Sequence, residues 1–309
     1  VSIFLGDELT DILKSIENDT FFNNKHAVQM DIGAKVLPHF TKDTTDRNRT
    51  SPFAFTGNKF EFRMVGSRDS ISECNVVLNT IAAEAFKEAC DRLEKADDFE
   101  MAVHDLIKEY AIDHQRIVFN GNGYAPEWAE EAKRRGLPNL PSMVDAIPAL
   151  TTDKAVKLFE EFHVFTKTEL ESRAEIQYEI YAKAVNIEAK TMIDLATKQI
   201  IPAVVRYTTV LADSVNTVRA VGDIDVSVQL ELLKKCSALL KTTNSAMKNL
   251  SDVVAKVSEI PEGRERAVYC KDIVCKAMTE LRTPVDELEM LVDKSMWPMP
   301  SYGDLVFEV

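Results

Sequence analysis

The chain has 309 residues, of which 45% are hydrophobic and 28% are charged, and this is the balance of a globular protein with one large or two ordinary domains. Its formal net charge of −13 argues against a nucleic-acid groove or an anionic membrane surface, because both bind clusters of lysine and arginine. The most apolar later window contains Pro202 and Arg206, so we expect no membrane span. The five cysteines are odd in number and scattered, which favours the reducing cytoplasm.

The first part of the chain mixes short helix and strand patterns. Apolar residues at helical spacing predict a helix over Leu5–Ile16, and the short apolar runs of His26–Phe40 are typical of strands and loop. The polar segment "TKDTTDRNRTSP" indicates a loop. Two strands are then predicted, over Phe53–Phe55 and Lys59–Val65, and the three-residue link that carries Gly57 predicts a hairpin between them.

From Ser70 onward the pattern is helical. Helices are predicted over Ser70–Ala96, over Phe99–His114 and, after the turn signal "FNGNGY", from Pro126 to Gly136. A proline-containing connector places the domain boundary near residue 150.

The second half, residues 151–309, consists of long amphipathic patterns joined by short polar links, which predict an antiparallel helical bundle. Thr168 and Glu171 have the spacing of a capping box at the start of one long helix. Thr283 and Pro284 predict the start of a last helix, with threonine as the cap and proline at the first position.

The chemical candidates are few. The histidines have no metal-ligand spacing, and the sequence has no glycine-rich phosphate loop, dinucleotide fingerprint or nucleophile elbow. In a strand, Lys59, Glu61 and Arg63 would project from one face and Phe60, Phe62 and Met64 from the other. One interpretation is a half-solvated strand with internal charge pairs. The other is part of a site for a polyanion and a metal, since glutamate ligates hard divalent ions and arginine binds phosphate or carboxylate oxygens.

The segment "DRNRTSPFAFTGNKFEFRMVGS", Asp46–Ser67, resembles the signature of glutamine synthetases, specifically the large type III bacterial form. Further segments look similar to the same type, among them "FNGNGYAPEWAEEAKRRGL", "VFTKTELESRAEI" and the ending "WPMPSYGDLVFEV". The resemblance implies an α+β fold. Residues 1–150 would be the C-terminal part of the catalytic β-sheet or barrel domain, and residues 151–309 the helical C-terminal domain of the type III enzyme.

The resemblance also implies the ATP-dependent ligation of ammonia to L-glutamate through γ-glutamyl phosphate, with Mg²⁺ or Mn²⁺. Glu61 would then be a metal ligand, and Arg63 would bind glutamate and take part in catalysis. Arg49 would bind both ATP and glutamate and also take part in catalysis, and Lys59 would lie near the nucleotide. Ala54 stands where other types have a second arginine, so that ATP contact would be supplied differently.

Family resemblance further implies a cytoplasmic homo-oligomer, a dodecamer of two hexameric rings, with glutamate, ammonia and ATP as its small-molecule partners. The family's other metal and glutamate-binding segments lie upstream of Asp46, so we expect the chain to be the C-terminal portion of the enzyme and to make no glutamine alone. The alternative is a non-catalytic helical oligomerisation or scaffold module with a remnant catalytic hairpin. A kinase-like or ATP-grasp ligase is disfavoured by the missing phosphate loop.

Overall fold

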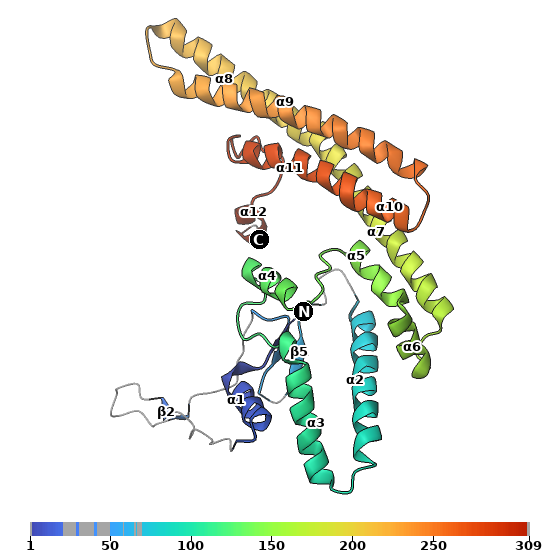
Figure 1. Cartoon of the computed structure of the whole chain (residues 1–309). Coiled ribbons are helices and arrows are strands. Elements are labelled where there is room, and N and C mark those ends of the chain that lie inside the picture. Colours follow the sequence, from blue (N-terminus) through green and yellow to red (C-terminus); the bar gives the residue numbers. More distant parts are fainter. Residues whose placement is uncertain are drawn as a thin grey trace. The chain divides into compact units, whose positions relative to one another are not determined.

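The computed structural model describes residues 2–20, 29–30, 40–41, 50–57, 59–64, 66 and 70–307 of the chain. The chain divides into two compact units (Figure 1). The first comprises Val1–Leu140 with Lys157–Val164, and the second Pro141–Val156 with Phe165–Val309. The assignment of residues 1–150 and 151–309 to a catalytic and a C-terminal domain stays a prediction.

A small sheet lies in the first unit. Its strands are β1 (Ile3–Phe4), β4 (Phe53–Phe55) and β5 (Phe60–Phe62), in the order β1-β4-β5. β1 runs parallel to β4, and β5 returns antiparallel to it, so the predicted hairpin is confirmed. A separate antiparallel pair joins β2 (Gln29–Met30) to β3 (Phe40–Thr41).

The hairpin link is longer than predicted, and the second strand is shorter. The backbone N–H of Thr56 donates to the Lys59 carbonyl at 2.8 Å and closes a link of four residues, Thr56–Lys59, rather than three. Gly57 has φ of 95°, in the left-handed region that glycine adopts without a steric penalty. Local turn geometry, rather than the extent of the alternating pattern, therefore sets where the two strands begin and end.

The helices of the first unit match the sequence pattern closely. They are α1 (Gly6–Glu17), α2 (Ile71–Leu93), α3 (Phe99–Asp113), the short 3-10 turn η1 (Gln115–Ile117) and α4 (Pro126–Arg134). Side chains of the expected type cap α2 and α3, since Ser70 and Asp98 accept backbone N–H bonds in their first turns. α2 and α3 lie side by side, and Arg92 on one donates two hydrogen bonds to Glu109 on the other (Figure 1).

All regular secondary structure in the described residues of the second unit is helical. Its elements are α5 (Met143–Ala146), η2 (Ile147–Thr151), α7 (Lys167–Leu195), η3 (Ala196–Ile200), α8 (Ile201–Val221), α9 (Ser227–Ala255), η4 (Lys256–Glu259), α10 (Arg264–Tyr269), η5 (Cys270–Val274), α11 (Cys275–Glu289) and α12 (Tyr302–Phe307). α6 (Asp153–Glu161) contributes residues to both units. The long helix α9 packs against α8 along one side and α11 along another (Figure 1). The predicted helical bundle is therefore confirmed, whereas the predicted catalytic barrel stays a proposal.

Clusters of buried apolar residues hold this unit together. Its main cluster joins α7, α9 and the segment from α10 to α11, and it contains Val185, Ala189, Leu250, Val254, Val274 and Leu281. Val185, Leu250 and Val254 belong to the apolar patterns at threes and fours that predicted the long amphipathic helices. Apolar periodicity in the sequence is thus sufficient to define the core faces here.

The predicted capping box at the start of the long helix is wrong by two residues. α7 begins after Thr166, whose hydroxyl accepts the Glu169 N–H at 3.4 Å while the Glu169 carboxylate accepts the Thr166 N–H at 2.8 Å. The spacing of Thr166 and Glu169 is the same as that of Thr168 and Glu171. The sequence offers two equivalent boxes, and the fold uses the earlier one.

The predicted start of a last helix at Thr283 and Pro284 is also wrong. Both residues lie inside α11, where the Thr283 hydroxyl donates back to the Thr279 carbonyl at 3.0 Å and Pro284 is buried. A proline inside a helix costs about 3 kcal/mol. The buried positions of α11 continue on both sides of it, at Leu281 and Leu288, so packing against the core outweighs that cost.

Pro202 has a different effect on the helix that contains it. The turn before it, η3, is a π-helix, and α8 begins with Pro202 in its first turn. Because proline has no N–H and its ring clashes with the carbonyl four residues earlier, a wider turn accommodates it without ending the helix. Among the helices of the described residues, none is both long and apolar enough to cross a membrane.

Candidate functional site

The β4–β5 hairpin separates charged from aromatic side chains. In its register Ala54 lies opposite Glu61, whereas Phe53 lies opposite Phe62 and Phe55 opposite Phe60. The phenylalanine rings contact one another on one face, with centroid distances of 5.3–6.0 Å. Glu61 therefore projects from the other face, next to the buried Ala54 of the central strand.

Lys59, Glu61 and Arg63 come together as the alternating pattern predicted. Nη2 of Arg63 lies 3.1 Å from Oε2 of Glu61, with Nε 3.3 Å from the same oxygen, and Nζ of Lys59 lies 3.5 Å from Oε1. The side chains of Lys59, Glu61 and Arg63 are 66%, 40% and 24% exposed. The hydrogen bond from Arg63, followed by the contact with Lys59, lowers the pKa of the Glu61 carboxyl below its ordinary value. We call these three residues the charged triplet.

The charged triplet has the chemistry of an anion site. Two cations flank one carboxylate, so the group carries a net positive charge although the whole chain is acidic. A guanidinium fork presents paired donors that match carboxylate or phosphate oxygens, and a lysine adds a mobile point charge. Arg63 is also fixed through its backbone, because its N–H donates to the Pro52 carbonyl at 2.7 Å.

The described residues do not form a metal centre by themselves. Within these ranges, no three His, Cys, Asp or Glu side chains are grouped so that they could hold an ion. A hard divalent cation takes about six oxygen ligands, whereas the triplet offers one carboxylate whose two oxygens both contact cations. The prediction that Glu61 ligates a metal thus requires further ligands from outside the described residues.

The remaining predicted site residue, Arg49, lies outside the described residues, as do its neighbours Arg47 and Asn48. The described segment that follows them is tied to another part of the first unit. The Thr50 carbonyl accepts a hydrogen bond from the Gly123 N–H at 2.7 Å. A Cβ on Gly123 would lie 3.2 Å from the same carbonyl oxygen, so the close approach of these two backbones favours glycine.

The sequence "FNGNGY" does more than form a turn. Oδ1 of Asn120 accepts the backbone N–H groups of Leu5 and Gly6 at 3.1 and 3.2 Å, and its Nδ2 donates to the Thr10 hydroxyl at 2.9 Å. Asn120 thereby supplies the acceptor for the first N–H groups of α1, a role that a local capping residue usually has. The sequence carries no signal for this contact, because the partners are 115 positions apart.

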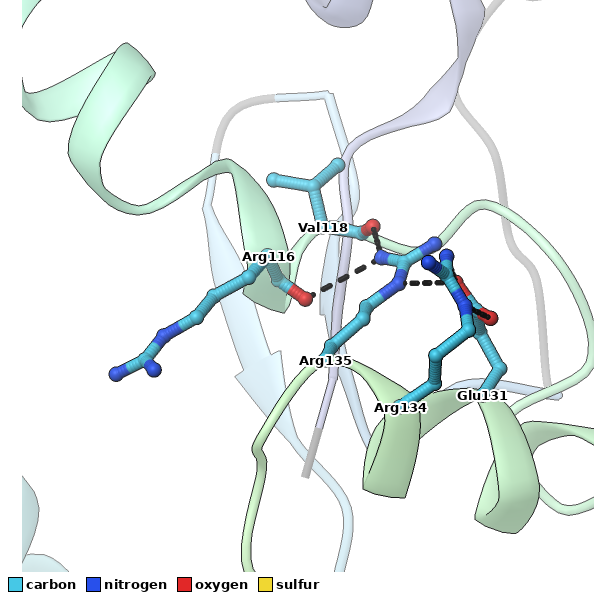
Figure 2. A network of polar contacts seen from close by, with 5 residues as sticks. All are labelled: Arg116, Val118, Glu131, Arg134 and Arg135. Atoms are coloured by element: carbon cyan, nitrogen blue, oxygen red, sulfur yellow. Dashed lines mark hydrogen bonds and ion pairs between the residues drawn. The ribbon is translucent and has the colours of Figure 1, made fainter.

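A second polar network, centred on Arg135, anchors the segment that precedes this turn (Figure 2). Nη1 of Arg135 donates to the carbonyls of Arg116 and Val118 at 3.2 and 2.9 Å, and its Nε donates to Glu131 at 2.5 Å. Figure 2 shows Arg134 reaching the same carboxylate, with its Nε 2.7 Å from Oε2, while the side chain of Arg116 points away from the network. The bonds from Arg134 and then Arg135 lower the pKa of Glu131 to about 2.

This network supports the sheet that carries the charged triplet. Val118 bridges to Ile3 of β1, and the Phe119 N–H donates to the Ile3 carbonyl at 2.9 Å. The guanidinium of Arg135 also lies over the Trp128 ring, 5.3 Å from its centroid, and Trp128 stacks on Phe119. Arg135 thus positions backbone at one edge of the sheet, whereas the triplet lies at the other edge, with Glu61 in β5 and Lys59 and Arg63 directly beside that strand.

The cysteines do not form a second candidate site. All five are free thiols, and Cys236 and Cys270 are buried. Burial raises the pKa of both of these thiols, so they remain protonated and act as small apolar side chains.

Comparison with known proteins identifies the family. Residues 102–219 match the model of the glutamine synthetase C-terminal domain. Over 99% of its length the chain is 37% identical to a type-3 glutamine synthetase of Dictyostelium discoideum. The chain belongs to the glutamine synthetase family. It is also similar to glutamine synthetases of Butyrivibrio fibrisolvens (35% identity over 100% of the chain) and Bacteroides fragilis (31% over 99%). The chain spans 43–44% of the length of these relatives.

The family model and the charged triplet occupy different parts of the chain. The matched residues begin within α3 and end within α8, so they include the Arg135 network but not the β4–β5 hairpin. The similarity to the glutamine synthetases of Dictyostelium discoideum and Butyrivibrio fibrisolvens covers nearly the whole chain, and it therefore includes the hairpin. The family model therefore supports membership of the family from residues 102–219, and the relatives support it over the rest of the chain as well.

Proposed function

We propose that the protein containing this chain joins ammonia to L-glutamate with the cleavage of ATP. The observation that carries the proposal is the charged triplet, in which Lys59 and Arg63 converge on one exposed face within a chain related to glutamine synthetases. The proposal concerns the whole protein, because the chain spans less than half of each relative.

In the proposed reaction an oxygen of the glutamate γ-carboxylate forms a bond to the γ-phosphorus of ATP, and ADP leaves. Ammonia then attacks the acyl carbon of γ-glutamyl phosphate, inorganic phosphate leaves, and a proton is lost from the new amide. Both steps bring anionic groups together, so catalysis depends mainly on positioning and on neutralising charge. Arg63 and Arg49 are proposed to bind glutamate and the transferred phosphoryl group, and Arg49 and Lys59 the nucleotide.

Glu61 is proposed to ligate Mg²⁺ or Mn²⁺ together with oxygens from parts of the protein beyond the described residues. The bound ion would draw charge from the ATP phosphates. If so, Glu61→Ala in the full-length protein weakens divalent-metal and ATP binding far more than it lowers the free energy of unfolding. A metal titration of the variant that matches the wild type would remove Glu61 from the site.

We also propose, from the similarity to glutamine synthetases, how the catalytic domain is built and how the subunits assemble. The small sheet would belong to a catalytic barrel, and the subunits would assemble as a cytoplasmic dodecamer of two hexameric rings. The helical second unit would contribute to this assembly or cover the barrel. Mass measurement of the purified full-length protein tests the number of subunits.

The competing function is a scaffold or oligomerisation module in which the hairpin is a remnant. The exposed convergence of the triplet favours the enzyme, because a scaffold has no use for two cations held on one face beside a carboxylate. If the protein is such a module, substitutions in the triplet would leave its assembly unchanged.

The test is glutamine formation by the full-length protein carrying Arg63→Gln. We expect kcat/KM for glutamate to fall by about 10²–10³, as for the loss of one group that stabilises developing charge. Arg92→Gln is the matched control, since Arg92 also pairs with a glutamate through two bonds but lies between α2 and α3. Equal activities of the two variants would contradict the proposed function.

A further inference from the structure

Both oxygens of the Glu61 carboxylate are occupied within the charged triplet. Oε2 faces the guanidinium of Arg63 at 3.1 and 3.3 Å, and Oε1 faces the ammonium of Lys59 at 3.5 Å. Glu61 is thus bound by its neighbours in the way that the carboxylate or phosphate of an anionic ligand would be bound. Each of the two cations therefore already has an anionic partner within the triplet.

The backbone keeps the three charged groups close together. Glu61 is two residues from each cation, and the alternation of a strand places all three side chains on one face. A group attached to the same strand acts at a high effective concentration, so it competes with a free anion even when each contact is weak. The opposite position of the hairpin is Ala54, whose small side chain leaves the three charged groups to interact with each other.

We propose that Glu61 is a built-in competitor for oxyanions at Lys59 and Arg63, and that an anionic ligand displaces it from both cations. The ligand class is a carboxylate or phosphate of the substrate or nucleotide. The released carboxylate does not become trapped in an apolar environment, because its side chain is 40% exposed and water replaces its partners. The inference rests on the proposed function only in that Lys59 and Arg63 are the anion-binding groups.

Neutralising Glu61 should change the affinity of the site for anions in a direction that depends on its role. If Glu61 only supported the site, its neutralisation would leave anion affinity unchanged or weaken it. If Glu61 competes, Glu61→Gln removes the competing charge and tightens anion binding in the absence of any metal. The expected gain is about two- to fivefold in Kd, the factor that corresponds to a partly exposed ion pair.

The experiment measures Kd for inorganic phosphate by calorimetry on the full-length protein, in EDTA and at constant ionic strength. Glu109→Gln is the control, because it removes the same charge from another carboxylate that an arginine holds by two bonds. We expect tighter binding for Glu61→Gln, no change for Glu109→Gln, and loss of the gain when Arg63→Gln is added to Glu61→Gln. Thermal unfolding of each variant verifies that it is folded.

The possible results distinguish failure of the competitor role from failure of the proposed function. Unchanged or weaker phosphate binding by a folded Glu61→Gln variant overturns the competitor role, and so does an equal gain in Glu109→Gln, which would show a general charge effect. The glutamine-forming assay of Arg63→Gln is independent of these measurements. An inactive Arg63→Gln variant together with unchanged phosphate affinity in Glu61→Gln would retain the proposed function and reject this inference.

Discussion

Helices α2 and α9 are both long, but they differ in how many of their side chains are buried. Within α2, which the structure describes in full, Thr80 is the single buried residue, and apolar side chains such as Ile81 and Phe86 are exposed. α9 buries Cys236, Thr243, Leu250 and Val254 against neighbouring helices. The long helices of the second unit therefore bury apolar side chains against one another, whereas α2 in the first unit buries few. The charged triplet of the first unit lies on and beside the three-residue strand β5.

The largest expected effect tests this contrast directly. Leu281 of α11 is 1% exposed in the main core cluster, and Phe86 of α2 is 72% exposed. We expect Leu281→Ala to lower the free energy of unfolding by about 2–5 kcal/mol, through lost burial and the cavity left behind. Phe86→Ala should change it by less than about 0.5 kcal/mol. Urea unfolding followed by circular dichroism measures both, and similar losses would break the comparison.

The next effect concerns polar support in the first unit. Arg135→Met keeps much of the apolar stem but removes the donors to the carbonyls of Arg116 and Val118. We expect a loss of about 1–3 kcal/mol in unfolding free energy, because these carbonyls lose their charged donor. Arg134→Met is the control, since Arg134 contacts the same Glu131 carboxylate but is more exposed. Equal losses in the two variants would show that the carbonyl bonds do not matter.

A smaller effect distinguishes the two capping boxes of α7. Thr166→Ala removes the hydroxyl that accepts the Glu169 N–H, and we expect it to cost about 0.5–2 kcal/mol. Thr168→Ala, at the position that sequence spacing favoured, lies within the helix and should cost much less. Denaturant midpoints of the two variants decide between the boxes, and a larger loss at Thr168 would restore the original prediction.

The smallest effect is a pH dependence that arises from Glu131. Its folded pKa is about 2, below the ordinary value of 4.5, so its favourable contribution is present above pH 4.5 and is lost as the pH falls toward 2. The difference in urea midpoint between wild type and Glu131→Gln should be constant above about pH 5 and shrink below it. The pH range over which the contribution of Glu131 is lost should become narrower in Arg134→Met than in Arg135→Met, because Arg134 lowers the pKa of Glu131 most. A difference that grows as the pH falls would contradict this assignment.

Sequence alone determined the helices, the hairpin and the grouping of Lys59, Glu61 and Arg63, because each depends on a short-range period of the backbone. Only the tertiary structure decided which of two capping boxes begins α7 and that Pro284 lies within α11, since packing of distant residues chose between local alternatives. The same holds for Asn120 at the start of α1 and for Arg135 on the carbonyls of η1 and Val118. Those contacts join segments that no local period relates, and the folded chain alone brings them together.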